Sequence, residues 1–145
     1  MSWKARLPLL AAALWWGSLT AIGFVAVPLL FSYLPTATAG QVAARLFSGQ
    51  AWISIGCGML VLMAARSGDE PPSMDWGRGA LAFVIGGLLL AVLVEFAVAP
   101  RIRLRQDLAF WHTLGTAFLA AQWFCALAVF WKLSAPSSSP TSASA

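Results

Sequence analysis

The chain has 145 residues, of which 60% are hydrophobic and only 10% are charged. A soluble domain carries about a quarter charged residues, because water must wet its surface. The composition therefore excludes an ordinary soluble globule and favours an integral membrane protein. The net charge of +4 comes from scattered Arg and Lys residues. No water-exposed element is long enough to form a basic face, so we expect no nucleic-acid partner.

Charged residues divide the chain into four long apolar stretches, and each of them can hold one membrane-spanning helix. We predict helices at about residues 7–33, 42–65, 77–99 and 108–132. A helix needs about 20 apolar residues to cross the hydrocarbon, and a helix satisfies its own backbone amides there. The predicted fold is an all-α integral membrane four-helix bundle over residues 1–133. A Ser/Pro/Ala tail at 134–145 has too few apolar residues to pack, and we expect it to be disordered.

The N-terminus also has features of a secretory signal peptide. Lys4 and Arg6 form a basic start, and Ala37 to Ala39 resembles a cleavage site. The apolar region of a signal peptide is only about 7–15 residues long, and the first apolar stretch is much longer, which favours a retained span. We expect the protein in a bacterial inner membrane with both termini cytoplasmic. The basic residues are divided almost equally between the two sides, so the positive-inside rule does not decide the orientation. The first helix, which usually dominates, favours cytoplasmic termini, whereas Arg101, Arg103 and Arg105 in one loop favour the opposite orientation.

The polar residues inside the predicted spans gather on one side of the membrane. Arg45 lies near the start of the second helix with Gln50 beyond it, Glu95 lies near the end of the third, and His112 lies about one turn into the fourth. Ionisable residues within a span usually face the bundle interior and have a partner. We therefore predict a polar pocket of Arg45, Gln50, Glu95 and His112, in which Arg45 and Glu95 form an ion pair.

Each of these residues also has a simpler interpretation. Glu95 can reach the headgroups, or can pair with an arginine that follows the third helix. Arg45 can be an ordinary interfacial arginine, and His112 can bind a loop carbonyl. The sequence leaves these alternatives open.

Two further patterns concern helix packing. Small residues four positions apart can bring helices close together in lipid, and four such stripes occur: Gly17 and Ala21, Ala82 and Gly86, Gly87 and Ala91, and Ala117 and Ala121. In addition, Phe24-Val-Ala-Val-Pro28 resembles Phe96-Ala-Val-Ala-Pro100, 72 positions later. A duplicated helical hairpin would explain this similarity, but prolines are ordinary near the ends of membrane helices and explain it without a duplication.

The sequence contains no recognisable cofactor, metal or catalytic motif. A bis-histidine haem needs two histidines, and the chain has only His112. Cys57 and Cys125 are too far along their helices to join Glu95 and His112 in a zinc site, which needs about four ligands. Met59 and Met63 share a helix face but are typical of packing. We expect no metal, no cofactor and no enzymatic activity.

The chain resembles the transmembrane protein 205-like family in several segments. They are Leu14-Trp-Trp-Gly-Ser18, Phe24-x-x-x-Pro28, Ala39-Gly-Gln-Val-Ala-Ala-Arg45-Leu-Phe47, Val98-Ala-Pro-Arg-Ile-Arg103 and Phe110-Trp-His112. The resemblance covers about Leu7 to Leu133 and implies a four-helix membrane architecture. The bacterial members of that family are catalogued mainly as a domain of unknown function, so the resemblance implies no particular chemistry.

Three classes of function follow. We favour a structural or accessory membrane protein, in contact with the lipid bilayer, whose polar cluster is an internal clasp. The alternative is a small transporter or metal-resistance-type protein that uses Glu95, His112 and Arg45. Four spans are few for a transport pathway, so this alternative predicts a homo-oligomer. An enzyme acting on lipid or quinone is the least favoured class. The sequence does not identify a small-molecule or ion ligand.

Overall fold

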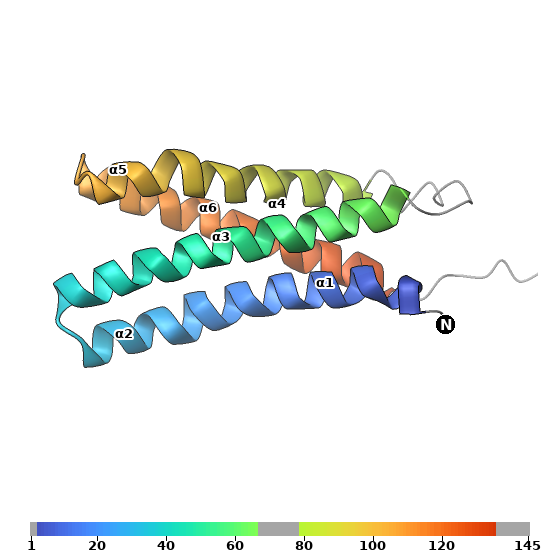
Figure 1. The fold of residues 1–145 in the computed structure, drawn as a ribbon, viewed down its shortest axis with the longest axis horizontal. Coiled ribbons are helices and arrows are strands. Elements are labelled where there is room, and N and C mark those ends of the chain that lie inside the picture. Colours follow the sequence, from blue (N-terminus) through green and yellow to red (C-terminus); the bar gives the residue numbers. More distant parts are fainter. Residues whose placement is uncertain (1–2, 67–78, 136–145) are drawn as a thin grey trace, which may run out of the picture.

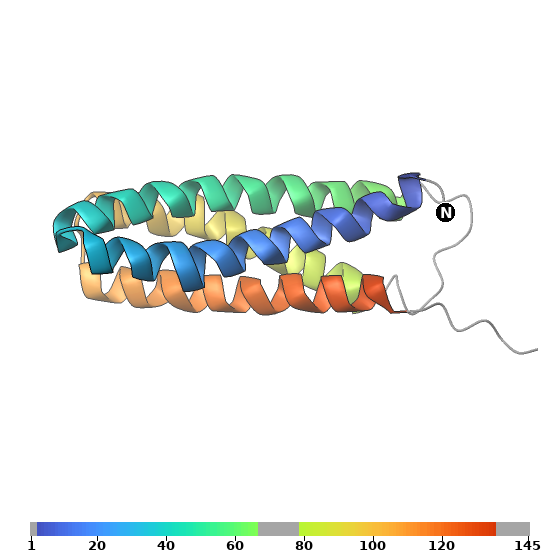
Figure 2. The same cartoon turned by 90° about the horizontal axis from the view of Figure 1, so that it is seen from below.

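A computed structural model describes the chain over residues 3–66 and 79–135. The described residues form four long helical spans that lie side by side (Figures 1 and 2). The first span consists of α1 (Trp3–Thr20), the π-helical segment η1 (Ala21–Ala26) and α2 (Val27–Tyr33), and the second is α3 (Thr36–Arg66). The third consists of α4 (Leu81–Leu93), the π-helical segment η3 (Val94–Val98) and α5 (Ala99–Arg103), and the fourth is α6 (Leu108–Ser134).

All four spans are long and apolar enough to cross a membrane, so the four-helix membrane fold is confirmed. Several helix boundaries differ from the prediction. The first span begins at Trp3 and not near residue 7, and the fourth ends at Ser134 and not at residue 132. Two further differences have a local cause. α3 begins at Thr36 and not near residue 42, because the N–H of Ala39 donates to the Pro35 carbonyl and closes the first turn directly after the proline. The third span continues to Arg103 and not to residue 99, because a proline such as Pro100 is compatible with a first helical turn. The tail beyond residue 135 and the 67–78 connection lie outside the described residues.

The two hairpin turns, at residues 34–35 and 104–107, lie at the same end of the bundle (Figure 1). We call this the hairpin-turn end, and we call the opposite end the closed end. The buried core lies toward the closed end, where large and small side chains interlock. Its members come from α1, α3, α4 and α6: Ala11, Ala12, Trp15, Leu19, Cys57, Val61, Val84, Ala126 and Val129.

Trp15 is the largest fully buried side chain of this core, and it packs directly on Gly87. A Cβ atom at Gly87 would lie only 2.6 Å from Cη2 of Trp15. The predicted stripe of Gly87 and Ala91 is therefore a real helix contact, and both residues are buried. The stripes of Gly17 with Ala21 and of Ala117 with Ala121 are exposed, and they make no such contact.

Both π-helical segments precede a proline. The N–H of Val27 donates to the Ile22 carbonyl, and the N–H of Ala99 donates to the Val94 carbonyl. Each donor stands immediately before Pro28 or Pro100. A proline ring crowds the carbonyl four residues before it, and the wider π turn gives that carbonyl room.

The two halves of the chain repeat these features at a constant spacing of 72 positions. Three features of the first half recur 72 positions later in the second half. They are the π hydrogen bond, the proline that follows it (Pro28 and Pro100), and the start of the next helix (Thr36 in α3 and Leu108 in α6). The structure therefore supports a duplicated helical hairpin. The first hairpin is α1 to α3 and the second is α4 to α6. Both run in the same direction, because their turns lie at one end (Figure 1).

Candidate functional site

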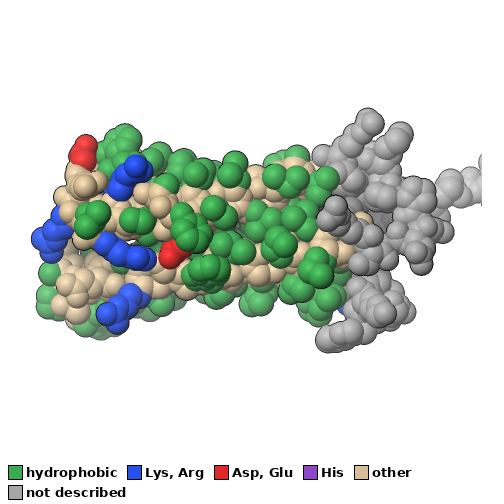
Figure 3. Space-filling view, turned by 45° about the horizontal axis from the view of Figure 1, so that its top comes forward, with side chains coloured by type: hydrophobic (Ala, Val, Ile, Leu, Met, Phe, Trp, Pro, Cys, Tyr) green, Lys and Arg blue, Asp and Glu red, His purple; other side chains and the backbone are tan. Residues whose placement is uncertain are grey.

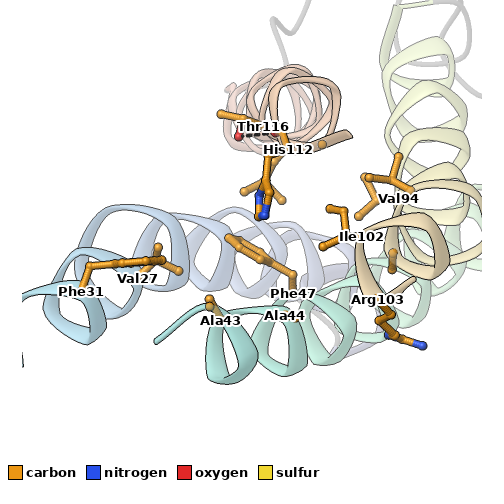
Figure 4. A pocket seen from close by; sticks show the side chains of 15 residues that line it. Val27, Phe31, Ala43, Ala44, Phe47, Val94, Ile102, Arg103, His112 and Thr116 are labelled. Carbon is orange, nitrogen blue, oxygen red and sulfur yellow. Dashed lines mark hydrogen bonds between the residues drawn. The ribbon is translucent and has the colours of Figure 1, made fainter. Parts of the chain in front are cut away.

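A cavity of about 290 Å³ lies at the hairpin-turn end, where the two hairpins meet. In Figure 4, Val27 and Phe31 of α2 lie across this space from Ile102 of α5, and the Arg103 side chain at the edge of the cavity points away from its centre. Residues of α3 and α6 form the other two walls. The cavity is mainly apolar, and its lining residues are Val27, Phe31, Gly40, Ala43, Ala44, Phe47, Val94, Val98, Ala99, Ile102, Arg103, His112, Gly115, Thr116 and Leu119.

Small residues line the faces of α3 and α6 that lie opposite each other across the cavity. Gly40, Ala43 and Ala44 occupy α3, and Gly115 occupies α6. A Cβ atom at Gly40 would meet no other atom within 4 Å. No residue of η1, α2 or α5 is buried. The helices at this end therefore enclose space that side chains do not fill.

His112 points from α6 into the cavity, toward the ring of Phe47 (Figure 4). Its backbone carbonyl accepts a hydrogen bond of 2.9 Å from the Thr116 hydroxyl. Among the described residues, no side chain or backbone group bonds to its imidazole. Both ring nitrogens are therefore available to a ligand, either as a donor and an acceptor or, when protonated, as two donors.

Glu95 does not pair with Arg45, and the predicted ion pair is not formed. Its Oε2 accepts a 2.8 Å hydrogen bond from the Ser48 hydroxyl of α3, and its Oε1 lies 3.7 Å from Nη2 of Arg103. The same Nη2 donates to the Ser48 hydroxyl at 2.8 Å. We call Ser48, Glu95 and Arg103 the polar clasp. Both arginines are exposed, but Arg103 lies farther along the span of Glu95 and reaches back to it, whereas Arg45 does not contact it.

Gln50 lies apart from the cavity, inside the bundle. It is 1% exposed, and its Nε2 lies 3.0 Å from the Ser18 hydroxyl of α1 and 3.2 Å from the Ser54 hydroxyl. Its Oε1 has no partner among the described groups. Residues five positions apart on an α-helix point in different directions, so Gln50 is buried while Arg45 is exposed. The four residues predicted as one pocket therefore occupy four different environments.

Sequence reasoning missed Ser48 and Arg103 as partners of Glu95, and it missed the cavity. A serine in an apolar helix carries no signal of its own. The repeat of 72 positions did carry a signal for the cavity. Twelve of the lining residues form six pairs at this spacing: Val27 and Ala99, Phe31 and Arg103, Gly40 and His112, Ala43 and Gly115, Ala44 and Thr116, and Phe47 and Leu119.

Two further polar contacts join different spans. Nε1 of Trp123 donates to the Thr20 hydroxyl at 2.9 Å and connects α6 with α1. Nε2 of Gln122 lies 3.4 Å from the Gly87 carbonyl and connects α6 with α4. In the part of the chain that the structure describes, no three His, Cys, Asp or Glu side chains come together as metal ligands would.

A family model described as a domain of unknown function, DUF4149, matches residues 10–110. The chain belongs to the DUF4149 family. The matched segment covers the described helices of the first hairpin from residue 10 on, the helices from α4 to α5, and the start of α6. It therefore contains the polar clasp and most of the residues that line the cavity. No curated protein and no solved structure matches the chain. Family membership agrees with a membrane domain of unknown function, and the more specific transmembrane protein 205-like name stays a prediction.

Proposed function

We propose that this DUF4149 protein is a non-catalytic accessory protein of the membrane, and that its polar clasp stabilises the arrangement of its helices. The observation that carries this proposal is the environment of Glu95. Both carboxylate oxygens face groups of the protein itself, and one of these groups, Ser48, belongs to the other hairpin. The carboxylate is therefore engaged in joining the two hairpins.

The remaining polar contacts within the spans fit the same role. The Trp123–Thr20 contact joins the two hairpins, as the clasp does. The Gln50–Ser18 contact joins the spans of the first hairpin, and the Gln122–Gly87 contact joins those of the second. Interhelical hydrogen bonds of this kind stabilise membrane bundles by about 0.6 kcal/mol each. Together they hold both hairpins and their interface in register.

A double-mutant cycle on Glu95 and Arg103 tests the clasp. We expect Glu95→Gln and Arg103→Gln each to lower the free energy of unfolding by about 1 kcal/mol. The double variant should lose about 0.5–1 kcal/mol less than the sum, because the second substitution removes a partner that is already unpaired. Thermal or detergent unfolding of the purified protein measures these losses.

Arg45→Gln is the matched control, because Arg45 is an exposed arginine at the same end that is not part of the clasp. We expect it to change stability by less than about 0.5 kcal/mol, and its combination with Glu95→Gln should be additive. Additive losses for Glu95 and Arg103 would contradict the clasp.

A flux assay tests the accessory role against a coupled transporter. The protein is reconstituted into liposomes that contain a pH-sensitive dye, and a proton gradient is applied. We expect no flux above that of empty liposomes. A flux that Glu95→Gln abolishes and Arg45→Gln preserves would identify a coupling carboxylate and would overturn the proposal.

A further inference from the structure

The cavity is not explained by the clasp. Only Arg103 belongs to both, and His112 faces the cavity with its imidazole unpaired among the described residues (Figure 4). A structural role for the polar cluster requires neither an open space nor a free imidazole beside it. The cavity therefore calls for a separate interpretation.

The two hairpins contribute different chemistry to equivalent positions of the wall. The first hairpin supplies Phe31 and Gly40, and the second supplies Arg103 and His112 at the same places in the repeat. The cavity thus has an apolar wall on the side of the first hairpin and polar groups on the side of the second. Such a space suits an occupant that is apolar along its length and polar at one end.

The position of the cavity indicates where that polar end lies. Arg103 is the last residue of the third apolar span, and His112 lies close to the start of the fourth, which begins at Ala109. Both residues are therefore expected near the level of the lipid headgroups. The apolar lining extends from there toward the bundle interior, through Val94 and Leu119.

The charges at this end favour an anionic head. Four exposed arginines, Arg45, Arg101, Arg103 and Arg105, lie near the hairpin turns, together with the two carboxylates Glu95 and Asp107. Figure 3 shows basic side chains, all of them arginines by sequence, gathered at this end, and mostly hydrophobic side chains along the described spans in that view. Basic pockets between transmembrane helices bind anionic lipid headgroups.

The volume favours a single chain. Ligand pockets range from about 300 to 1,000 Å³, and this cavity of about 290 Å³ is at the lower limit. We propose that it holds one acyl chain of an anionic phospholipid, with the phosphate against His112 at the arginine-rich end of the cavity. His112 offers its ring nitrogens to the phosphate, whereas the guanidinium of Arg103 is held by Glu95 and Ser48 and contributes positive charge nearby.

Native mass spectrometry of the full chain tests this proposal. The purified protein is equilibrated in detergent with equal amounts of phosphatidylglycerol and phosphatidylcholine of the same acyl composition, and the lipids retained on each chain are identified. We expect one retained phosphatidylglycerol, preferred about fivefold over phosphatidylcholine, as one headgroup–cation contact would produce. Equal retention of the two lipids would overturn the anionic head, and retention of a co-purified quinone instead would overturn the phospholipid.

Two matched pairs of variants locate the site. Gly40→Leu fills the cavity from α3, and Gly49→Leu places the same side chain on an exposed position of the same helix; a Cβ atom at either glycine meets no atom within 4 Å. We expect Gly40→Leu to abolish retention and Gly49→Leu to preserve it. His112→Ala should remove the preference for phosphatidylglycerol, whereas Thr113→Ala, its exposed neighbour, should not.

Equal retention by Gly40→Leu and the wild type would place the lipid elsewhere and overturn the cavity site. A thermal melt of each variant shows that it is folded, and the headgroup preference of the wild type tests the anionic head without any variant. These substitutions leave Ser48, Glu95 and Arg103 intact, so failure of the lipid site and failure of the clasp are separate results.

Discussion

The two ends of the bundle differ in how equivalent positions of the two hairpins fill space. At the closed end, Trp15 of the first hairpin packs on Gly87, which is its counterpart 72 positions later. The large indole of Trp15 thus fills the space beside Gly87, which has no side chain. At the hairpin-turn end, Ala43 and its counterpart Gly115 are both small, and a cavity remains. One repeated scaffold therefore gives a packed core where sizes are complementary and an open site where they are not.

The largest difference between the two ends should come from truncating one aromatic residue at each. We expect Trp15→Ala to lower the free energy of unfolding by about 3 kcal/mol, because a buried cavity forms and its lining loses dispersion contacts. Phe47→Ala enlarges a space that is already open and should cost less than about 1 kcal/mol. Thermal or detergent unfolding compares the two variants. Similar losses would show that the two ends are packed alike.

The next effect concerns the glycine under Trp15. Gly87→Ala should destabilise the protein by about 1–3 kcal/mol, because the new methyl group would overlap a rigid indole ring that is fully buried. Gly86→Ala is the control, since its Cβ would meet only Sγ of Cys125, at 3.9 Å. The same unfolding measurement distinguishes them. Equal free energies of unfolding for Gly87→Ala and Gly86→Ala would contradict close packing at the closed end.

The smallest effect is expected for the buried glutamine between these regions. Gln50→Leu removes the contacts with Ser18 and Ser54 but also removes an oxygen that has no partner among the described groups. The two changes oppose each other, so we expect a loss of no more than about 0.6 kcal/mol. Gln41→Leu, at an exposed position of α3, is the control and should be neutral in the same unfolding measurement. A loss of several kcal/mol for Gln50→Leu would show that the polar network contributes more than the apolar core.

The candidate site was only partly predictable from the sequence. The expectation that polar residues gather at one level was useful, because Glu95, Arg103 and His112 all lie at the hairpin-turn end. The ion pair of Arg45 with Glu95 was not formed, because sequence position specifies how deep a residue lies but not the direction in which its side chain points. Ser48 could not be identified for the same reason: its role depends on facing Glu95 across the interface of the two hairpins.

The sequence by itself determined the number of spans and their approximate limits, and it showed the similarity at 72 positions without deciding whether this is a duplication. Hydropathy is a sum over neighbouring residues, and the requirement for about 20 apolar residues per span is local. Only the tertiary structure decided which small-residue stripe is a helix contact, which arginine reaches Glu95, and where space remains. These outcomes depend on the rotation of each helix about its axis, which arises from packing between helices, such as that of Trp15 on Gly87, and not from the hydropathy of any one segment.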